Sequence, residues 1–275
     1  MMRSLVYDTR CAVRELLLSM AAAFGLTLLL LISAYAEFGF ANDFIGRPVL
    51  GDNVLVVLAG KQLPEWRPGV ILIPPTGWIA LLLLTLVPSL GHPSYDLYDL
   101  TGRSVLAMGS RTAWWNAKIT WTMATVLIVM FGSLSACFVW TLCCGQDFSL
   151  VATGAGFDLV LSGDFPELDA LDLNVPILVS LLSVCALACV QLLLSVFLRP
   201  TLAFIATLSQ LVLAYYFDWP FLVGNGAMLL RSELLAASGG VGSRHAVWSL
   251  LMIALSYFLG LRLFRGLDVL KGGGL

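Results

Sequence analysis

The feature that most constrains this chain is the length of the segments between its charged residues. A helix that crosses the hydrocarbon core of a bilayer needs about 20 consecutive apolar residues, and several uncharged runs in the sequence reach or exceed that length. Only 12% of the residues are charged and 59% are hydrophobic, whereas a soluble globular domain has roughly 25% charged residues. The chain is therefore predicted to be an integral membrane protein.

Six uncharged runs are each suited to form a membrane-crossing helix. Two of them are separated by Arg199 alone, which leaves room only for a tight turn. The last run is extended because Arg262 can reach the headgroups with its aliphatic stem. We predict an all-α fold with a single transmembrane domain over residues 1–275. The expected spans are residues 16–36, 76–92, 119–142, 176–198, 200–217 and 246–264.

The basic residues predict the orientation of these spans, because cytoplasmic loops of membrane proteins carry an excess of Lys and Arg. With the N-terminus inside, ten of the fifteen basic residues and five of the seventeen acidic residues fall on the cytoplasmic side. We expect a multi-pass protein of the cell membrane with both termini in the cytoplasm. A second interpretation stays open, since residues 1–36, with Ala34-Tyr35-Ala36 at their end, also resemble a secretory signal with its cleavage site.

Several segments outside the spans have a distinct character. Residues 1–15 place arginines among apolar side chains, a spacing typical of a helix that lies in the membrane interface. The outer loop 143–175 is acidic and has no Lys or Arg, and Gly154-Ala155-Gly156 within it permits a hairpin. The apolar stretches 54–59 and 219–230 are too short to cross. We expect the first to lie against the outer surface and the second to be a re-entrant or interfacial helix.

The sequence lacks the motifs of the common enzyme classes. It contains no G-x-x-x-x-G-K-[ST] phosphate loop, no H-E-x-x-H and no G-x-S-x-G. Its two histidines, His92 and His245, are expected on opposite sides of the membrane, and the vicinal pair Cys143-Cys144 lacks the spacing of a structural metal site. We therefore expect no enzymatic activity, no catalytic residue, no cofactor and no metal in this chain.

Polar residues inside the predicted spans are few and uncharged. The middles of the spans hold essentially no ionisable residue, which disfavours a proton- or ion-coupled carrier. Gln191, Ser209 and Gln210 are the best candidates to line a substrate path. The alternative use of such side chains is to join helices by hydrogen bonds, and both interpretations stay open.

The cytoplasmic loop 93–118 carries a resemblance to a known family. Its run Leu97-Tyr98-Asp99-Leu100-Thr101-Gly102-Arg103-Ser104-Val105-Leu106-Ala107-Met108-Gly109-Ser110-Arg111-Thr112-Ala113-Trp114-Trp115-Asn116-Ala117-Lys118 resembles the first cytoplasmic loop of ABC-2 type permeases, the transmembrane subunits of ATP-binding-cassette transporters. Independently, Ser110 suits the N-cap of the next helix, and Trp114, Trp115 and Lys118 suit the headgroup zone.

The resemblance implies a fold and a mode of action. The loop would hold a cytoplasmic coupling helix between the second and third spans, which docks on a separate ATPase subunit and passes nucleotide-driven motion to the spans. The residues to which this ATPase-coupling role is carried over are Asp99, Arg103, Met108 and Arg111. The other interpretation of these four residues is an ordinary solvated loop that follows the positive-inside rule.

The resemblance also implies the partners. ATP would be bound by the ATPase partner, a second permease chain would complete the transporter, the lipid membrane would surround it, and no nucleic acid would take part. The uncharged spans favour export of a lipophilic, amphipathic or peptide-like substrate. The alternatives are a secondary carrier or channel and a non-transporting immunity or sensor protein.

Overall fold

The computed structural model describes residues 2–39, 47–62, 74–90, 110–161, 171–219, 221–232 and 243–266. This part of the chain is mostly helical. Its α-helices are α1 (Met2–Gly39), α2 (Leu50–Leu58), α3 (Thr76–Leu90), α6 (Arg111–Cys143), α7 (Gly154–Leu161), α8 (Asn174–Phe197), α9 (Pro200–Tyr216) and α10 (Ser243–Gly266). The remaining elements are the strands β1 (Val151–Ala152) and β2 (Leu171–Asp172) and the 3-10 helices η2 (Val223–Ala227) and η3 (Leu229–Arg231).

Four of these helices are long and apolar enough to cross a membrane: Val13–Glu37 within α1, α6, α8, and Arg244–Leu263 within α10. The chain thus has the helices of a multi-pass, all-α membrane protein. α3 and α9 are also apolar, but they have 15 and 17 residues. All six segments that the sequence marked as spans are therefore helical, and two of them are shorter than the others.

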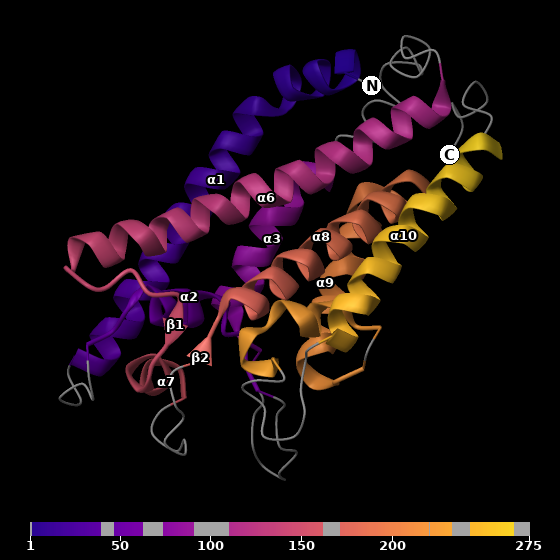
Figure 1. The fold of residues 1–275 in the computed structure, drawn as a ribbon. Helices are drawn as coiled ribbons and strands as arrows, with labels where there is room; N and C mark the ends of the chain where they lie inside the picture. The colour runs from indigo at the N-terminus through magenta and orange to yellow at the C-terminus, as the bar shows by residue number, and fades with distance from the viewer. Residues whose placement is uncertain are drawn as a thin grey trace.

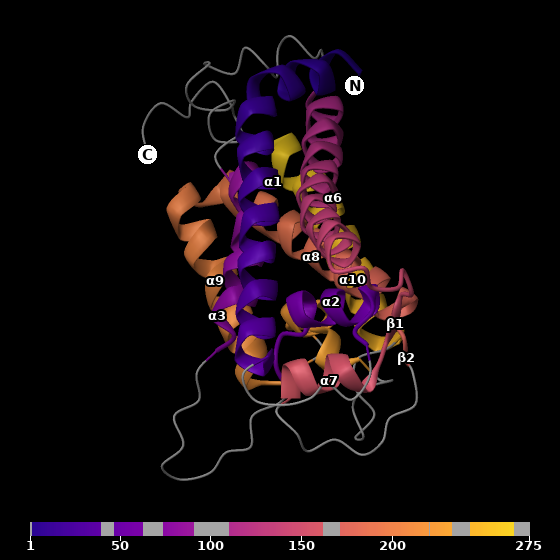
Figure 2. The same cartoon turned by 90° about the vertical axis from the view of Figure 1, so that its left-hand side faces the viewer.

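The long helices form an up-and-down bundle (Figure 1). α1, α6 and α9 run in one direction, and α3, α8 and α10 run in the other. The N-terminal end of α1 and the C-terminal end of α10 lie at the same end of the bundle. α1 and α6 lie side by side, and α2, α7 and the strands gather at the opposite end (Figure 2). We call this opposite group, residues 47–62, 146–161 and 171–173, the end cap.

Small and hydroxyl-bearing residues let the helices approach closely. The Thr27 and Ser133 hydroxyls lie 2.7 Å apart between α1 and α6, and the Ser183 and Ser249 hydroxyls lie 3.0 Å apart between α8 and α10. Each pair is buried, so each hydroxyl finds in a neighbouring helix the partner that lipid cannot supply. The rest of the helix contacts are apolar, and side chains such as Leu81, Leu82, Leu86, Val129 and Met130 are completely buried.

α1 and α6 both extend beyond the predicted spans. α6 begins at Arg111 and not at residue 119, because the Ser110 hydroxyl accepts a hydrogen bond from the Ala113 amide at 3.0 Å and caps the helix there. Residues 111–118, expected in the coupling loop, therefore belong to the helix. α1 is continuous from Met2, and Figure 1 shows its first turns bent away from the rest.

Two predictions for the end cap were wrong. The stretch 54–59, expected on the outer surface, lies almost entirely in α2, and all its residues except Val56 are buried. Gly154-Ala155-Gly156, expected at a hairpin turn, begins the helix α7, and β1 pairs in antiparallel fashion with β2 instead. Asp52 of α2 caps the start of α7, because its carboxylate accepts hydrogen bonds from the backbone amide and hydroxyl of Thr153, the residue before that helix.

The contact between α6 and α10 gives a test of the packing. Gly260 of α10 faces the fully buried Trp115 ring, and a Cβ at position 260 would overlap that ring. We expect Gly260→Ala to lower the free energy of unfolding by about 1–3 kcal/mol, as overpacking does. The matched control is Gly25→Ala in α1, where nothing lies within 4 Å and alanine is the better helix former.

The measurement is the thermal unfolding midpoint of the detergent-solubilised protein, followed by tryptophan fluorescence. The Gly260 variant should unfold at a lower temperature than the wild type, and the Gly25 variant should not. Equal midpoints for the two variants would contradict the packing of α6 on α10.

Candidate functional site

The predicted ATPase-coupling residues lie around the start of α6. Asp99, Arg103 and Met108 fall outside the described residues. Arg111 is the first residue of α6 and is partly exposed, directly after the Ser110 cap. Further along the helix, Lys118 is 1% exposed and its ammonium lies 5.6 Å from the centre of the Trp114 ring. The start of α6 is thus anchored in the protein, and not only in the headgroup zone as expected.

The three residues predicted to line a substrate path do not face one common space. Gln191 of α8 is completely buried, and its amide nitrogen donates to the Leu86 carbonyl of α3 at 2.9 Å. Its amide oxygen has no hydrogen-bond partner among the described residues. Ser209 of α9 is exposed and Gln210 is partly exposed. Gln191 therefore connects α8 to α3 near Pro88, whereas Ser209 lies on the outer face of the bundle.

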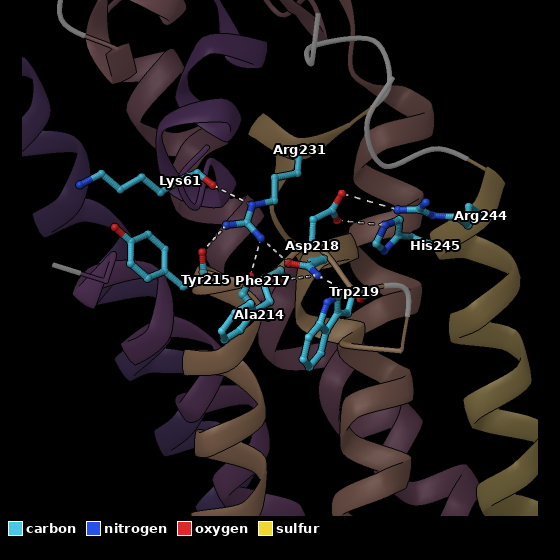
Figure 3. Close-up of polar contacts among 10 residues, drawn as sticks. Lys61, Ala214, Tyr215, Phe217, Asp218, Trp219, Arg231, Arg244 and His245 are labelled. Atoms are coloured by element: carbon cyan, nitrogen blue, oxygen red, sulfur yellow. Dashed lines mark hydrogen bonds and ion pairs between the residues drawn. The ribbon is translucent and has the colours of Figure 1, made fainter. Parts of the chain in front are cut away.

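A buried arginine that sequence analysis did not single out is the centre of a polar cluster (Figure 3). Arg231, in η3, is 3% exposed. Its Nε donates to the Lys61 carbonyl at 3.0 Å and its Nη2 to the Tyr215 carbonyl at 2.7 Å. Its Nη1 donates to the Ala214 carbonyl and to the Asn225 side-chain oxygen.

The partners of Arg231 explain why its charge is buried there. Ala214 and Tyr215 belong to the last turn of α9, whose carbonyls have no partner within the helix and carry the negative end of its dipole. A guanidinium satisfies both needs. Burial lowers the Arg231 pKa to about 10, and the nearby Asp218 carboxylate acts in the opposite direction. Because that pKa stays well above 7, Arg231 is charged at neutral pH.

Asn225 and Asp218 extend the cluster. The Asn225 amide nitrogen donates to the Phe217 and Trp219 carbonyls at 2.9 and 3.2 Å, which fixes the chain that leaves α9. Asp218 then lies 3.6 Å from Arg244 and 3.7 Å from His245, at the start of α10. The cluster thus joins the end of α9 to η2, η3, α10 and the chain after α2, and it acts as a brace between elements.

The expected re-entrant segment, 219–230, contributes Trp219 and Asn225 to this brace. Trp219 and Phe221 are exposed, whereas all residues from 222 to 232 are buried and form the two 3-10 turns η2 and η3. The Ala227 carbonyl accepts hydrogen bonds from Trp78 of α3 and Ser180 of α8, at 3.3 and 3.1 Å. Residues 222–232 therefore pack between the ends of several helices. We call them the buried return segment.

A second polar network connects the end cap to the long helices. Asn53 of α2 accepts a hydrogen bond from the Tyr35 hydroxyl of α1 at 2.7 Å and donates to Thr141 of α6 and to Gln146, both at 2.8 Å. Next to it, Asp52 is completely buried, and this burial raises its pKa, while hydrogen bonds from Thr153 and Val49 act in the opposite direction. Gln146 adds a second tie, because its amide nitrogen donates to the Tyr35 hydroxyl at 3.1 Å.

The described residues contain no group of three or more His, Cys, Asp or Glu side chains that could hold a metal ion. Cys143 and Cys144, at the end of α6, are both exposed, and Cys137, Cys185 and Cys189 are buried in the helices. The buried cysteines pack as small apolar side chains.

Comparison with protein-family models, with curated proteins and with solved structures gave no match. The resemblance of residues 97–118 to ABC-2 type permeases thus stays a prediction from the sequence. The geometry above is the basis for the functional proposal.

The Arg231 brace can be tested by substitution. Arg231→Gln removes the charge and leaves carbonyls of α9 unsatisfied, and each buried unsatisfied group costs about 1–3 kcal/mol. Arg231→Lys keeps the charge but lacks the planar fork that reaches several carbonyls at once. We expect the unfolding midpoint in detergent to fall in the order wild type, Arg231→Lys, Arg231→Gln.

The control is Arg47→Gln, because Arg47 belongs to the same end of the molecule but its side chain is exposed. This variant should unfold within error of the wild type. If the Arg231→Gln protein is as stable as the Arg47→Gln control, Arg231 does not brace the fold.

Proposed function

We propose that this chain is the membrane-spanning permease subunit of an ATP-binding-cassette transporter, an exporter of a lipophilic, amphipathic or peptide-like substrate driven by a separate ATPase. The observation that carries the proposal is the course of the chain at the end of the bundle where α6 begins. The segment that resembles the ABC-2 coupling loop follows α3 and precedes the capped start of α6 in the chain, and α6 starts at the same end of the bundle as the N-terminal end of α1 and the C-terminal end of α10.

The directions of the helices favour six crossings. α1 and α6 run in the same direction (Figure 1), so if both cross the membrane the chain between them must return across it, and α3 is the apolar helix that does so. The same reasoning applies to α9, which lies between α8 and α10. Helices of 15 and 17 residues span roughly 22 and 25 Å, somewhat less than a hydrocarbon core of about 30 Å.

The charge distribution supports a cytoplasmic location for the end where α6 begins. Arg111 starts α6, Arg199 lies between α8 and α9, and Arg262 lies near the end of α10, all at that end of the bundle. Counted over the described residues, the half of the bundle at that end has eight Lys and Arg residues, and the opposite end has four, Arg47, Lys61, Arg231 and Arg244. By the positive-inside rule the first end faces the cytoplasm, where an ATPase is located.

α6 provides a direct mechanical connection between the two ends. It has 33 residues and is therefore about 50 Å long. It begins next to the coupling loop, and near its other end Thr141 accepts a hydrogen bond from Asn53 of the end cap. A displacement that a bound ATPase imposes at Arg111 would be carried along this helix to the end cap. Rigid-body movement of the spans requires such a connection.

The first experiment is affinity purification of the tagged chain from native membranes in detergent, followed by identification of copurifying proteins. We expect an ATPase subunit to copurify with the wild type and to be lost, by at least tenfold, from the double variant Arg103→Glu/Arg111→Glu. The physical reason is charge: in the proposed complex Arg103 and Arg111 attract the ATPase partner, and reversal of both charges turns that attraction into repulsion.

Two controls make the result specific. Arg262→Glu reverses an exposed charge at the same end of the bundle and should retain the ATPase. Size-exclusion chromatography and the unfolding midpoint establish that the double variant is folded. If the folded wild type yields no ATPase, the proposal fails, and a carrier, a channel or a non-transporting immunity or sensor protein becomes the better assignment.

A further inference from the structure

Three aromatic side chains form an exposed row directly after α9. Phe217, Trp219 and Phe221 are 36%, 50% and 48% exposed. The Phe217 and Trp219 rings are stacked with their centres 4.9 Å apart, and the centres of the Trp219 and Phe221 rings are 5.3 Å apart. We call these three residues the aromatic row. Large rings gathered on a surface usually mark contact with another apolar material.

The row arises from the extended chain that leaves α9. Phe217 has φ −131° and ψ 132°, and in such a backbone successive side chains point to opposite sides. Asp218 therefore points away from the rings and lies near Arg244 and His245. Figure 3 shows the Asp218 carboxylate and the Trp219 ring on opposite sides of the chain. This segment thus has one charged side and one aromatic side.

The Arg231 cluster holds the aromatic row in place from the inside. The Asn225 amide nitrogen donates to the carbonyls of Phe217 and Trp219, and the Asn225 oxygen accepts a hydrogen bond from Arg231. The backbone that carries two of the rings is therefore fixed. The buried return segment fills the space behind it, so the rings remain on the surface.

The length of α9 indicates the depth at which the row lies. Its 17 residues span about 25 Å, whereas the hydrocarbon core of a bilayer is about 30 Å thick. If α9 crosses the membrane, the residues that follow Tyr216 have only just reached the far boundary of the core. Tryptophan is enriched at this boundary, because its ring is apolar and its N–H group is polar.

We infer that the aromatic row binds phospholipids of the leaflet on the end-cap side, with its rings at the boundary between the acyl chains and the headgroups. The Trp219 indole N–H has no hydrogen-bond partner among the described residues, and it can donate to an ester or phosphate oxygen of a lipid. Asp218 and Arg244 lie on the other side of the segment, toward water. Because its backbone is fixed, the row sets the depth of the end of α9 in the bilayer.

This inference rests on the part of the proposed function in which α9 crosses the membrane, and it does not depend on an ATPase. The two failures are distinguishable. Lipid contact is measured on the purified chain in liposomes, where no ATPase is present, whereas the functional proposal is tested by copurification from native membranes.

The experiment is quenching of tryptophan fluorescence by brominated lipids. The wild type and Trp219→Phe are reconstituted in phosphatidylcholine that carries bromine near the headgroup, near the chain ends or not at all. The signal of Trp219 is the difference between the two proteins. We expect this difference to fall by about twofold with bromine near the headgroup, and to fall less with bromine near the chain ends. Phenylalanine keeps an aromatic ring in the row, so the unfolding midpoint of the variant should stay close to that of the wild type.

A spin label at position 221 gives a second measurement that leaves Trp219 intact. Cys11, Cys143 and Cys144 are replaced by serine, and Phe221→Cys is labelled with a nitroxide. Its depth follows from collisions with lipid-soluble oxygen and with a water-soluble nickel complex. The matched controls are Leu255→Cys, a 52% exposed position near the middle of α10, and Arg47→Cys, an exposed position in the end cap.

The two measurements decide which material covers the row. Quenching by bromine near the headgroup, with a label at position 221 that is shallower than at 255 and deeper than at 47, supports the inference. A Trp219 signal that brominated lipid leaves unchanged, or a label at 221 as accessible to nickel as the label at 47, would overturn it in favour of a protein or substrate on this surface. A label at 221 as deep as at 255 would also overturn it. If Trp219→Phe does not fold, the label at 221 decides alone.

Discussion

The absence of water from the hydrocarbon core is the constraint on which the rest of this structure depends. Each backbone amide and carbonyl there must find its partner within the protein, and helices satisfy this need along their length but not at their ends. The described residues show three different solutions for helix ends. The Ser110 hydroxyl begins α6, the Asp52 carboxylate accepts amides at the start of α7, and the Arg231 guanidinium binds the last carbonyls of α9.

These end groups differ in how far they lie from their helix along the chain, and this decides what the sequence could predict. Ser110 directly precedes α6, so its role as a cap was visible in the sequence and the structure confirms it. Asp52 lies about 100 residues before the helix that it caps, and no local pattern connects the two. The hairpin at Gly154 was wrongly predicted because the residue that caps α7 is so distant in the sequence.

The spans were the most predictable part of the molecule, because run length and hydropathy depend on local sequence alone. All six predicted segments are helical, although their ends differ, most of all at the start of α6. Burial was less predictable. An apolar segment such as 54–59 has the same composition on a surface as in a core, and α2 is buried because α7, β1, α1 and α6 all pack against it. Arg231 was missed for a similar reason, since an arginine between spans is usually solvated.

The brace at Arg231 has a consequence for how the chain tolerates change. Three of its four hydrogen bonds go to main-chain carbonyls, of Lys61, Ala214 and Tyr215, and only the fourth goes to a side chain. Any residue at position 61 offers the same carbonyl, so the exposed lysine there could be exchanged freely as far as the brace is concerned. An inserted or deleted residue next to position 61 would instead shift the carbonyl itself. This end of the protein is thus sensitive to the length of its connections and tolerant of their composition.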